Sequence, residues 1–117
     1  MRLEIQVNDK KVEKIVSDYN KIIKNIGNDM TRQFKKRIDQ LKAAENFKEY
    51  LDTGLGDPHP LIGNLDRMFG IRLNRNYRLI VEPISVFLDD ESLKKCDQVN
   101  LKGVVDYHDG KCEWIIP

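Results

Sequence analysis

Apolar and polar residues alternate at the start of the chain and recur at helical spacing after it. The apolar positions of residues 3–7 alternate, which predicts a short strand. Those of residues 12–26 recur every three or four positions, which predicts an amphipathic helix. Gly27 and the two polar residues after it predict the end of that helix, and residues 30–51 predict a second one. Because the connection is so short, we expect an antiparallel helical hairpin.

The second half of the chain predicts strands and turns. Residues 69–81 read FGIRLNRNYRLIV, and a hairpin around residues 74–76 places the apolar residues of both strands on one face. Residues 89–96 predict a capped helical turn, after Pro83 at the end of the second strand. A third strand over 99–108 and a last one over 112–116 are expected, joined by a tight turn at Asp109-Gly110.

This order of elements predicts an α+β fold in a single domain over residues 1–117. The N-terminal strand and the antiparallel helical hairpin are expected to pack on an antiparallel-rich sheet, with an extra C-terminal strand. The glycine- and proline-rich segment 53–60 is predicted to be a loop.

Composition narrows the class of protein. Of 117 residues, 40% are hydrophobic and 33% are charged, and the formal net charge is +1, so a soluble globular protein is expected and any basic surface must be local. The start of the chain lacks the apolar block of a signal peptide, which favours the cytoplasm. Cys96 and Cys112 are most simply free thiols there, although a disulfide between them is compatible with the sequence. His59 and His108 are too few and too far apart to indicate a zinc site, and no metal or cofactor is expected.

Basic residues concentrate in the predicted helices. Residues 10–48 hold eleven lysines and arginines against five acids. These side chains have two interpretations: the solvated outer face of two amphipathic helices, or a basic surface for RNA or an acidic partner segment.

The hairpin over 69–81 also concentrates arginines. Its register sets Arg72 directly opposite Arg78, with Arg75 at the tip and Arg67 just before the first strand. One interpretation is a pair of exposed arginines that cover the sheet. The other is an anion clamp, because guanidinium groups suit phosphate oxygens. Four arginines and no acid between residues 67 and 78 favour the clamp.

A second candidate site is Asp106-Tyr107-His108, which ends a predicted strand. Asp106 and His108 are expected on one face of the strand with Lys102, and Tyr107 on the other. Histidine suits proton transfer near neutral pH, and tyrosine could stack on an unpaired base or lend its hydroxyl. Taken alone, such a triplet is more typical of turn chemistry.

Together, these segments resemble the RelE-like toxins, in particular the HigB or plasmid-maintenance killer branch. The resemblance lies in HPLIGNLDRMFGIRLNRNYRLIVEP followed by VVDYH, from His59 to His108, with residues 84–98 unmatched. It implies a β-α-α-β-β-β fold, to which this chain adds its C-terminal strand.

The resemblance implies a ribosome-dependent mRNA endonuclease that uses no metal and is neutralised by a cognate antitoxin with a DNA-binding helix-turn-helix domain. Messenger RNA on the ribosome would be the substrate, and neither a membrane nor direct DNA binding is expected. Position by position, Asp106, Tyr107 and His108 match the closing catalytic triplet, and Arg72 and Arg78 match arginines that hold the scissile phosphate. His59 matches the histidine before the proline, where its role is either structural or chemical.

One position departs from the family pattern. Some relatives have a lysine where this chain has Ile62, and isoleucine is neither a base nor an anion ligand. Either Arg67, Arg75 or Lys102 takes over that duty, or the chain is a RelE-like module that binds RNA, a ribosome or an antitoxin without cutting. The enzyme interpretation requires one geometry above all: the arginine pair and the His108 imidazole must share one pocket.

Overall fold

The structure is a computed structural model that describes residues 2–117, and it is a single α+β domain built on one six-stranded mixed sheet. Within these residues, no helix has the length and apolar content needed to cross a membrane. In chain order the elements are β1 (Glu4–Gln6), α1 (Lys10–Val16), α2 (Tyr19–Ala43), α3 (Phe47–Thr53), β2 (His59–Pro60), the 3-10 helix η1 (Gly63–Leu65), β3 (Phe69–Arg72), β4 (Tyr77–Pro83), α4 (Asp90–Lys94), β5 (Gln98–His108) and β6 (Lys111–Ile116).

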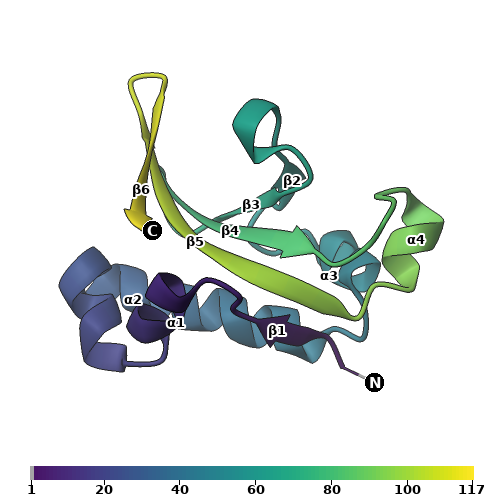
Figure 1. The fold of residues 1–117 in the computed structure, drawn as a ribbon, viewed down its shortest axis with the longest axis horizontal. Helices are drawn as coiled ribbons and strands as arrows, with labels where there is room; N and C mark the ends of the chain where they lie inside the picture. The colour runs from purple at the N-terminus through teal and green to yellow at the C-terminus, as the bar shows by residue number, and fades with distance from the viewer. Residues whose placement is uncertain (1) are drawn as a thin grey trace.

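The long strand β5 organises the sheet, whose order is β1-β5-β4-β3-β2. The first half of β5 pairs with β1 in parallel, and its second half pairs with β6 in antiparallel fashion. Helices α1 and α2 cover one side of the sheet, whereas the β2–η1 segment and the tip of the β5–β6 hairpin rise on the other side (Figure 1). The predicted fold class, with its added C-terminal strand, is therefore confirmed.

The helical region is more divided than predicted. The chain does reverse at Gly27, whose φ of 83° interrupts α2, so that Lys35 lies over the ring of Tyr19 at 5.4 Å. The predicted helices are wrong in their continuity, however, because the first also breaks at residues 17–18 and the second at residues 44–46. Asp18 and Asn46 start new helices there by capping them with their side chains.

The β3–β4 hairpin has the predicted register, with Ile71 opposite Leu79 and Arg72 opposite Arg78. The Asn74 side chain closes the loop by accepting from the backbone N–H groups of Asn76 and Tyr77 at 2.9 and 2.6 Å. The local sequence thus holds the two arginines on neighbouring strands.

The two faces of the sheet are buried by different groups. Leu79 and Val104 belong to the main core beneath the helices. Their chain neighbours Ile80 and Val105 are also fully buried but lie outside that core, on the opposite face. The opposite face is therefore covered as well, and the candidate site lies on this face.

Candidate functional site

A cavity of about 690 Å³ lies on the face of the sheet away from the helices. Its lining comes from the β2–η1 segment on one side and from β4, β5 and β6 on the other. The lining residues are His59, Pro60, Leu61, Ile62, Asn64, Leu65, Arg78, Tyr107, Cys112 and Trp114. The volume is in the range of small-ligand sites.

Strand register explains why these side chains share a face. Arg78 pairs with Val105, and Val105 pairs with Trp114, so all three project to the same side. Tyr107 is two residues from Val105 and pairs with Cys112, which places both on that side too. The cavity wall is thus a direct consequence of the pairing of β4, β5 and β6.

Arg78 supplies the guanidinium group that lines the cavity. Its Nη1 donates to the carbonyl oxygens of Asn74, Tyr77 and Arg75 at 2.8, 3.1 and 3.2 Å. These bonds fix the guanidinium through one nitrogen, and the group remains able to offer other N–H donors to an anion. Burial, and next the positive charge of Arg72, lower the pKa of Arg78. An arginine keeps its charge in spite of such a shift, and a bound anion would relieve the repulsion.

His59 enters the cavity from β2. Its Nδ1 lies 3.0 Å from the backbone oxygen of Asp57. Because a carbonyl oxygen only accepts, Nδ1 carries the hydrogen in this contact, and Nε2 is the nitrogen with the lone pair whenever the imidazole is neutral. The local backbone therefore selects the tautomer in which Nε2 can accept a proton.

Tyr107 contributes a protonated hydroxyl. Burial, followed by the neighbouring Cys112 thiol, raises the pKa of Tyr107, against the opposing charge of Arg78. A phenol whose pKa lies above its usual value near 10 is a hydrogen donor throughout the neutral range.

Asp106 and His108 lie on the opposite face of the same hairpin. His108 Nδ1 is 3.3 Å from Asp106 Oδ2, and His108 Nε2 is 3.9 Å from Glu113 Oε1. Asp106 pairs with Tyr77 of β4, which confirms that its side chain points away from Arg78. The hypothesis that the His108 imidazole shares a pocket with the arginine pair is therefore wrong, because regular alternation carries Tyr107 into the cavity and its two neighbours out of it.

The other predicted phosphate ligands stand outside the cavity lining. Arg72 neighbours Arg78 but lies 4.0 Å from the exposed Asp57 carboxylate, and Arg75 is exposed at the hairpin tip. Arg67 is tied elsewhere, since its guanidinium donates to the backbone oxygens of Ser85 and Val86.

Lys102 is also absent from the lining of the cavity. It falls at a bulge where β5 shifts register against β4, between the pairs Ile80–Gly103 and Val81–Leu101. Lys102 was expected on the same face of the strand as Asp106 because side chains alternate every two residues. An extra residue at a bulge interrupts that alternation.

Cys112 and Trp114 are site residues that the sequence analysis missed. The Asp109-Gly110 turn, with φ of 48° and 74°, is a two-residue hairpin loop. Such a loop fixes the pairing of Tyr107 with Cys112 and of Val105 with Trp114. Asp109-Gly110 was therefore the sequence signal that places Cys112 and Trp114 on the same face of the hairpin as Tyr107.

The next feature is the arrangement of side chains that could bind a metal ion. Between residues 2 and 117, His, Cys, Asp and Glu side chains do not gather in a group of three or more that could hold an ion. Asp106 and Glu113 approach opposite ring nitrogens of His108, so these three groups do not converge on one position. Cys96 is buried and Cys112 is exposed, and neither forms a disulfide.

Comparison with known proteins supports the fold. No family model matches the sequence, and no curated protein matches it. Among solved structures, the chain is similar to YoeB in the YoeB–YefM complex and in the YoeB dimer, both from Staphylococcus aureus. Each match has 19% sequence identity and a TM-score of 0.53, and covers 92% of this chain and 99% of the YoeB chain. A heterotetrameric YoeB–YefM toxin–antitoxin complex from the same organism matches with a TM-score of 0.52.

At this level of identity the likeness shows the fold, which is RelE/YoeB-like. These neighbours are YoeB chains, so the narrower resemblance to the HigB branch stays a prediction.

Proposed function

We propose that this chain is the toxin of a type II toxin–antitoxin system and that it acts as a ribosome-dependent mRNA endonuclease. The required meeting of His108 with the arginine pair fails, so the proposal depends on a different imidazole: one cavity holds the imidazole of His59, the guanidinium of Arg78 and the phenol of Tyr107. This is a set of groups able to take a proton, hold a phosphate and return a proton. The shared fold with YoeB chains, which occur in complexes with YefM, adds support for an antitoxin partner.

The reaction would use the RNA's own ribose hydroxyl as nucleophile. The 2′-oxygen attacks the adjacent phosphorus while its proton passes to His59 Nε2, which the Asp57 contact leaves with a lone pair. The bond from phosphorus to the 5′-oxygen breaks, and the Tyr107 hydroxyl donates a proton to that oxygen. The products are a 2′,3′-cyclic phosphate and a free 5′-hydroxyl.

Arg78 would stabilise the charge that grows on the phosphate oxygens. It lines the cavity with its position already fixed by the loop carbonyls, so little reorganisation is needed when the anion arrives. Arg72, directly across the strand pair, adds a second positive charge to the approach. In this scheme Arg67, Arg75 and Lys102 do not touch the scissile phosphate, and Asp106 and His108, on the other face of the hairpin, take no part in proton transfer.

The proposal is tested with the full chain. Expression alone is expected to arrest growth, and purified protein is expected to cut mRNA in translating ribosomes. The fragments should carry 2′,3′-cyclic phosphate ends that resist ligation of a 3′ adaptor until the ring is opened and the phosphate is removed to leave a free 3′-hydroxyl. Intact message under these conditions, with a folded protein, would contradict the enzyme proposal. A cognate antitoxin should restore growth, and whether it carries a helix-turn-helix domain stays a prediction.

A module that binds RNA without cutting is the second candidate. Ile62 favours it, because this side chain is 89% exposed at the cavity where some relatives have a lysine. An apolar group there supports contact with a base or a protein but no proton transfer. Salt-sensitive binding to ribosomes together with uncut message would select this function over the first.

A further inference from the structure

We propose that Trp114 is a stacking platform for a nucleobase, so that the cavity recognises an unpaired nucleotide and not a bare phosphate. The inference rests on the proposed RNA ligand and adds a specificity-determining residue from β6, the strand that the chain adds to its fold. Trp114 has no role in the cleavage scheme above, yet it lines the same cavity as Arg78.

A continuous row of cross-strand partners places the indole relative to the cation. Arg72 pairs with Arg78, Arg78 with Val105, and Val105 with Trp114, across β3, β4, β5 and β6. Because neighbouring strands lie about 4.8 Å apart, the backbones of Arg78 and Trp114 are about 10 Å apart. A single nucleotide presents the same polarity, with an anionic phosphate at one end and an aromatic base at the other.

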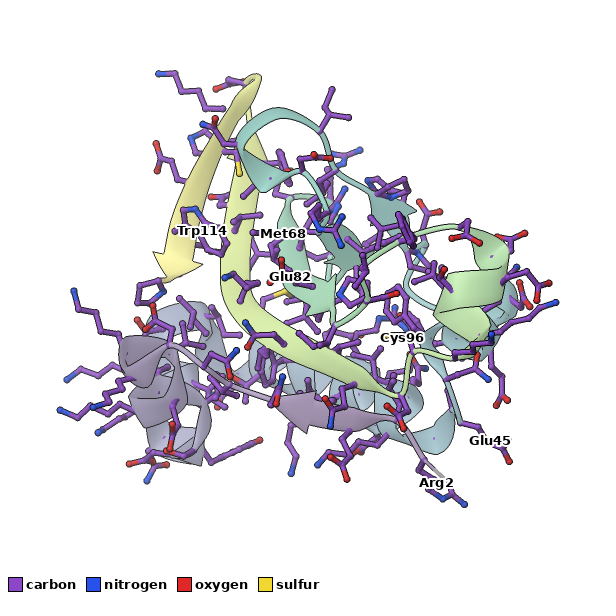
Figure 2. The ribbon with its side chains drawn as sticks, turned by 45° about the vertical axis from the view of Figure 1, so that its right-hand side comes forward. Arg2, Glu45, Met68, Glu82, Cys96 and Trp114 are labelled. Atoms are coloured by element: carbon purple, nitrogen blue, oxygen red, sulfur yellow. The ribbon has the colours of Figure 1, made fainter. Side chains whose placement is uncertain are left out.

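A glycine on β5 lets one edge of the indole come close to the strand backbone. A Cβ atom on Gly103 would come within 3.1 Å of Trp114 Cζ3 and 2.2 Å of the backbone oxygen of Ile116. Gly103 also has a φ of 142°, which L side chains rarely adopt. One part of the ring therefore packs on bare backbone, and the side chain as a whole remains 42% exposed. Figure 2 shows Trp114 on β6, far along β5 from Cys96.

The facing wall of the cavity is mostly apolar, with His59 and Asn64 as its polar members. Pro60, Leu61, Ile62 and Leu65 line it from the β2–η1 segment. Leu61 is itself held over the sheet, where it would be 3.4 Å from a Cβ at Gly70. In this proposal a flat, uncharged base lies between this wall and the indole, and Arg78 binds the phosphate attached to it. The exposed Ile62 side chain cannot transfer a proton, but it can contact the face of the base that is turned away from Trp114.

The test uses Trp114 as its own reporter, because it is the single tryptophan of the chain. The full-length protein is titrated with a short single-stranded RNA whose riboses are 2′-O-methylated to prevent cleavage. The control is an abasic oligomer with the same number of phosphates. Binding is followed by anisotropy of a terminal label and, separately, by tryptophan fluorescence. The base-containing RNA is expected to quench Trp114 on saturation and the abasic oligomer to leave it nearly unchanged.

Two substitutions sharpen the result. Trp114→Leu is expected to weaken binding of the base-containing RNA about tenfold, in line with the loss of one stacked base, and to leave the abasic oligomer unaffected. Trp114→Phe should recover most of that loss. Arg78→Ala should weaken both oligomers alike. Thermal unfolding of each variant checks that the fold is kept, and the fluorescence of the unaltered protein gives an answer even where a variant does not fold.

The outcomes separate this inference from the proposed nuclease. Quenching by the base-containing RNA without cleavage on ribosomes supports stacking and rejects the enzyme. If Trp114→Leu cleaves mRNA with the KM and kcat of the parent, and RNA at saturation does not quench the parent, the stacking proposal is overturned. The nuclease proposal then still stands. Equal affinity of Trp114→Leu and parent for both oligomers, or no binding of either oligomer, also overturns the stacking proposal.

Discussion

The two faces of the β5–β6 hairpin differ sharply, although alternating residues of the same two short segments make them. One face presents Tyr107, Cys112 and Trp114 to a cavity that contains Arg78. The other presents His108 between the carboxylates of Asp106 and Glu113. The first face is cationic and aromatic, whereas the second is acidic around one imidazole.

This difference teaches that adjacency in sequence is a poor guide to a shared site on a strand. Asp106, Tyr107 and His108 are consecutive, and a motif-based assignment treats them as one unit. In a pleated strand, successive side chains point to opposite faces, so a regular strand can give either the tyrosine or its two neighbours to a cavity, not all three. The histidine that reaches the cavity, His59, comes from a segment 49 positions earlier than His108.

Removing the cavity cation should have the largest effect. Arg78→Ala is expected to lower the rate of mRNA cleavage on ribosomes by about 10²- to 10³-fold, as for loss of one preorganised donor to a developing oxyanion. Arg75→Ala removes the same charge three residues away at the exposed tip, and we expect less than about threefold loss, since surface charges contribute weakly. Comparable losses in both variants would mean that general positive charge, not the cavity, matters.

The two histidines offer a matched pair, one on each face. His59→Ala is expected to slow cleavage about 10²-fold, because it removes the proton acceptor of the cavity. His108→Ala should leave the rate within about threefold, because this half-buried side chain lies on the face of the hairpin away from the cavity. The reverse ranking in single-turnover cleavage assays would return the catalytic role to His108 and refute the assignment of faces.

The close approach of β6 to β5 can be broken at Gly103. A methyl group there meets the Ile116 carbonyl at 2.2 Å in a backbone conformation that favours glycine, so Gly103→Ala should cost about 2 kcal/mol of unfolding free energy. Gly110→Ala also falls at a positive φ, 74° against 142° at Gly103, but has open space around it, and should cost about 1 kcal/mol. Urea unfolding of both variants compares a crowded glycine with an open one; equal losses would argue against the collision.

The smallest expected effect concerns the Tyr107 hydroxyl. Tyr107→Phe should lower the cleavage rate about tenfold, below the usual gain from general acid catalysis because water can substitute as donor. Tyr77→Phe alters a tyrosine on the other face and should have no effect on cleavage.

The same residue predicts a pH dependence. The pKa of Tyr107 is raised in the folded state, so its proton is retained as pH rises through the usual value near 10 and is lost only above it. The stability that this shift contributes is complete below pH 10 and disappears at higher pH. Ultraviolet absorbance titrations of the parent and Tyr107→Phe should differ by one tyrosine with a midpoint above 10, and a midpoint at or below 10 would contradict the burial of this hydroxyl.

The sequence by itself determined the elements whose causes are local. The alternation of residues 69–81 gave the β3–β4 register and the facing arginines, and Asp109-Gly110 gave the last hairpin. It also indicated the reversal at Gly27, but not the extra breaks at residues 17–18 and 44–46, because two capping side chains compete there with a helical pattern that continues on either side.

Only the tertiary structure decided which chemical groups meet. His59 reaches the cavity because β2 pairs with β3, a two-residue contact too short to leave a pattern in the sequence. Lys102 does not lie on its predicted face because a bulge in β5 breaks the alternation. Arg67 donates to a backbone oxygen of the loop that follows β4. Short pairings, bulges and loop contacts depend on residues distant along the chain, whereas alternation and tight turns depend on neighbours, and this is the physical reason for the division.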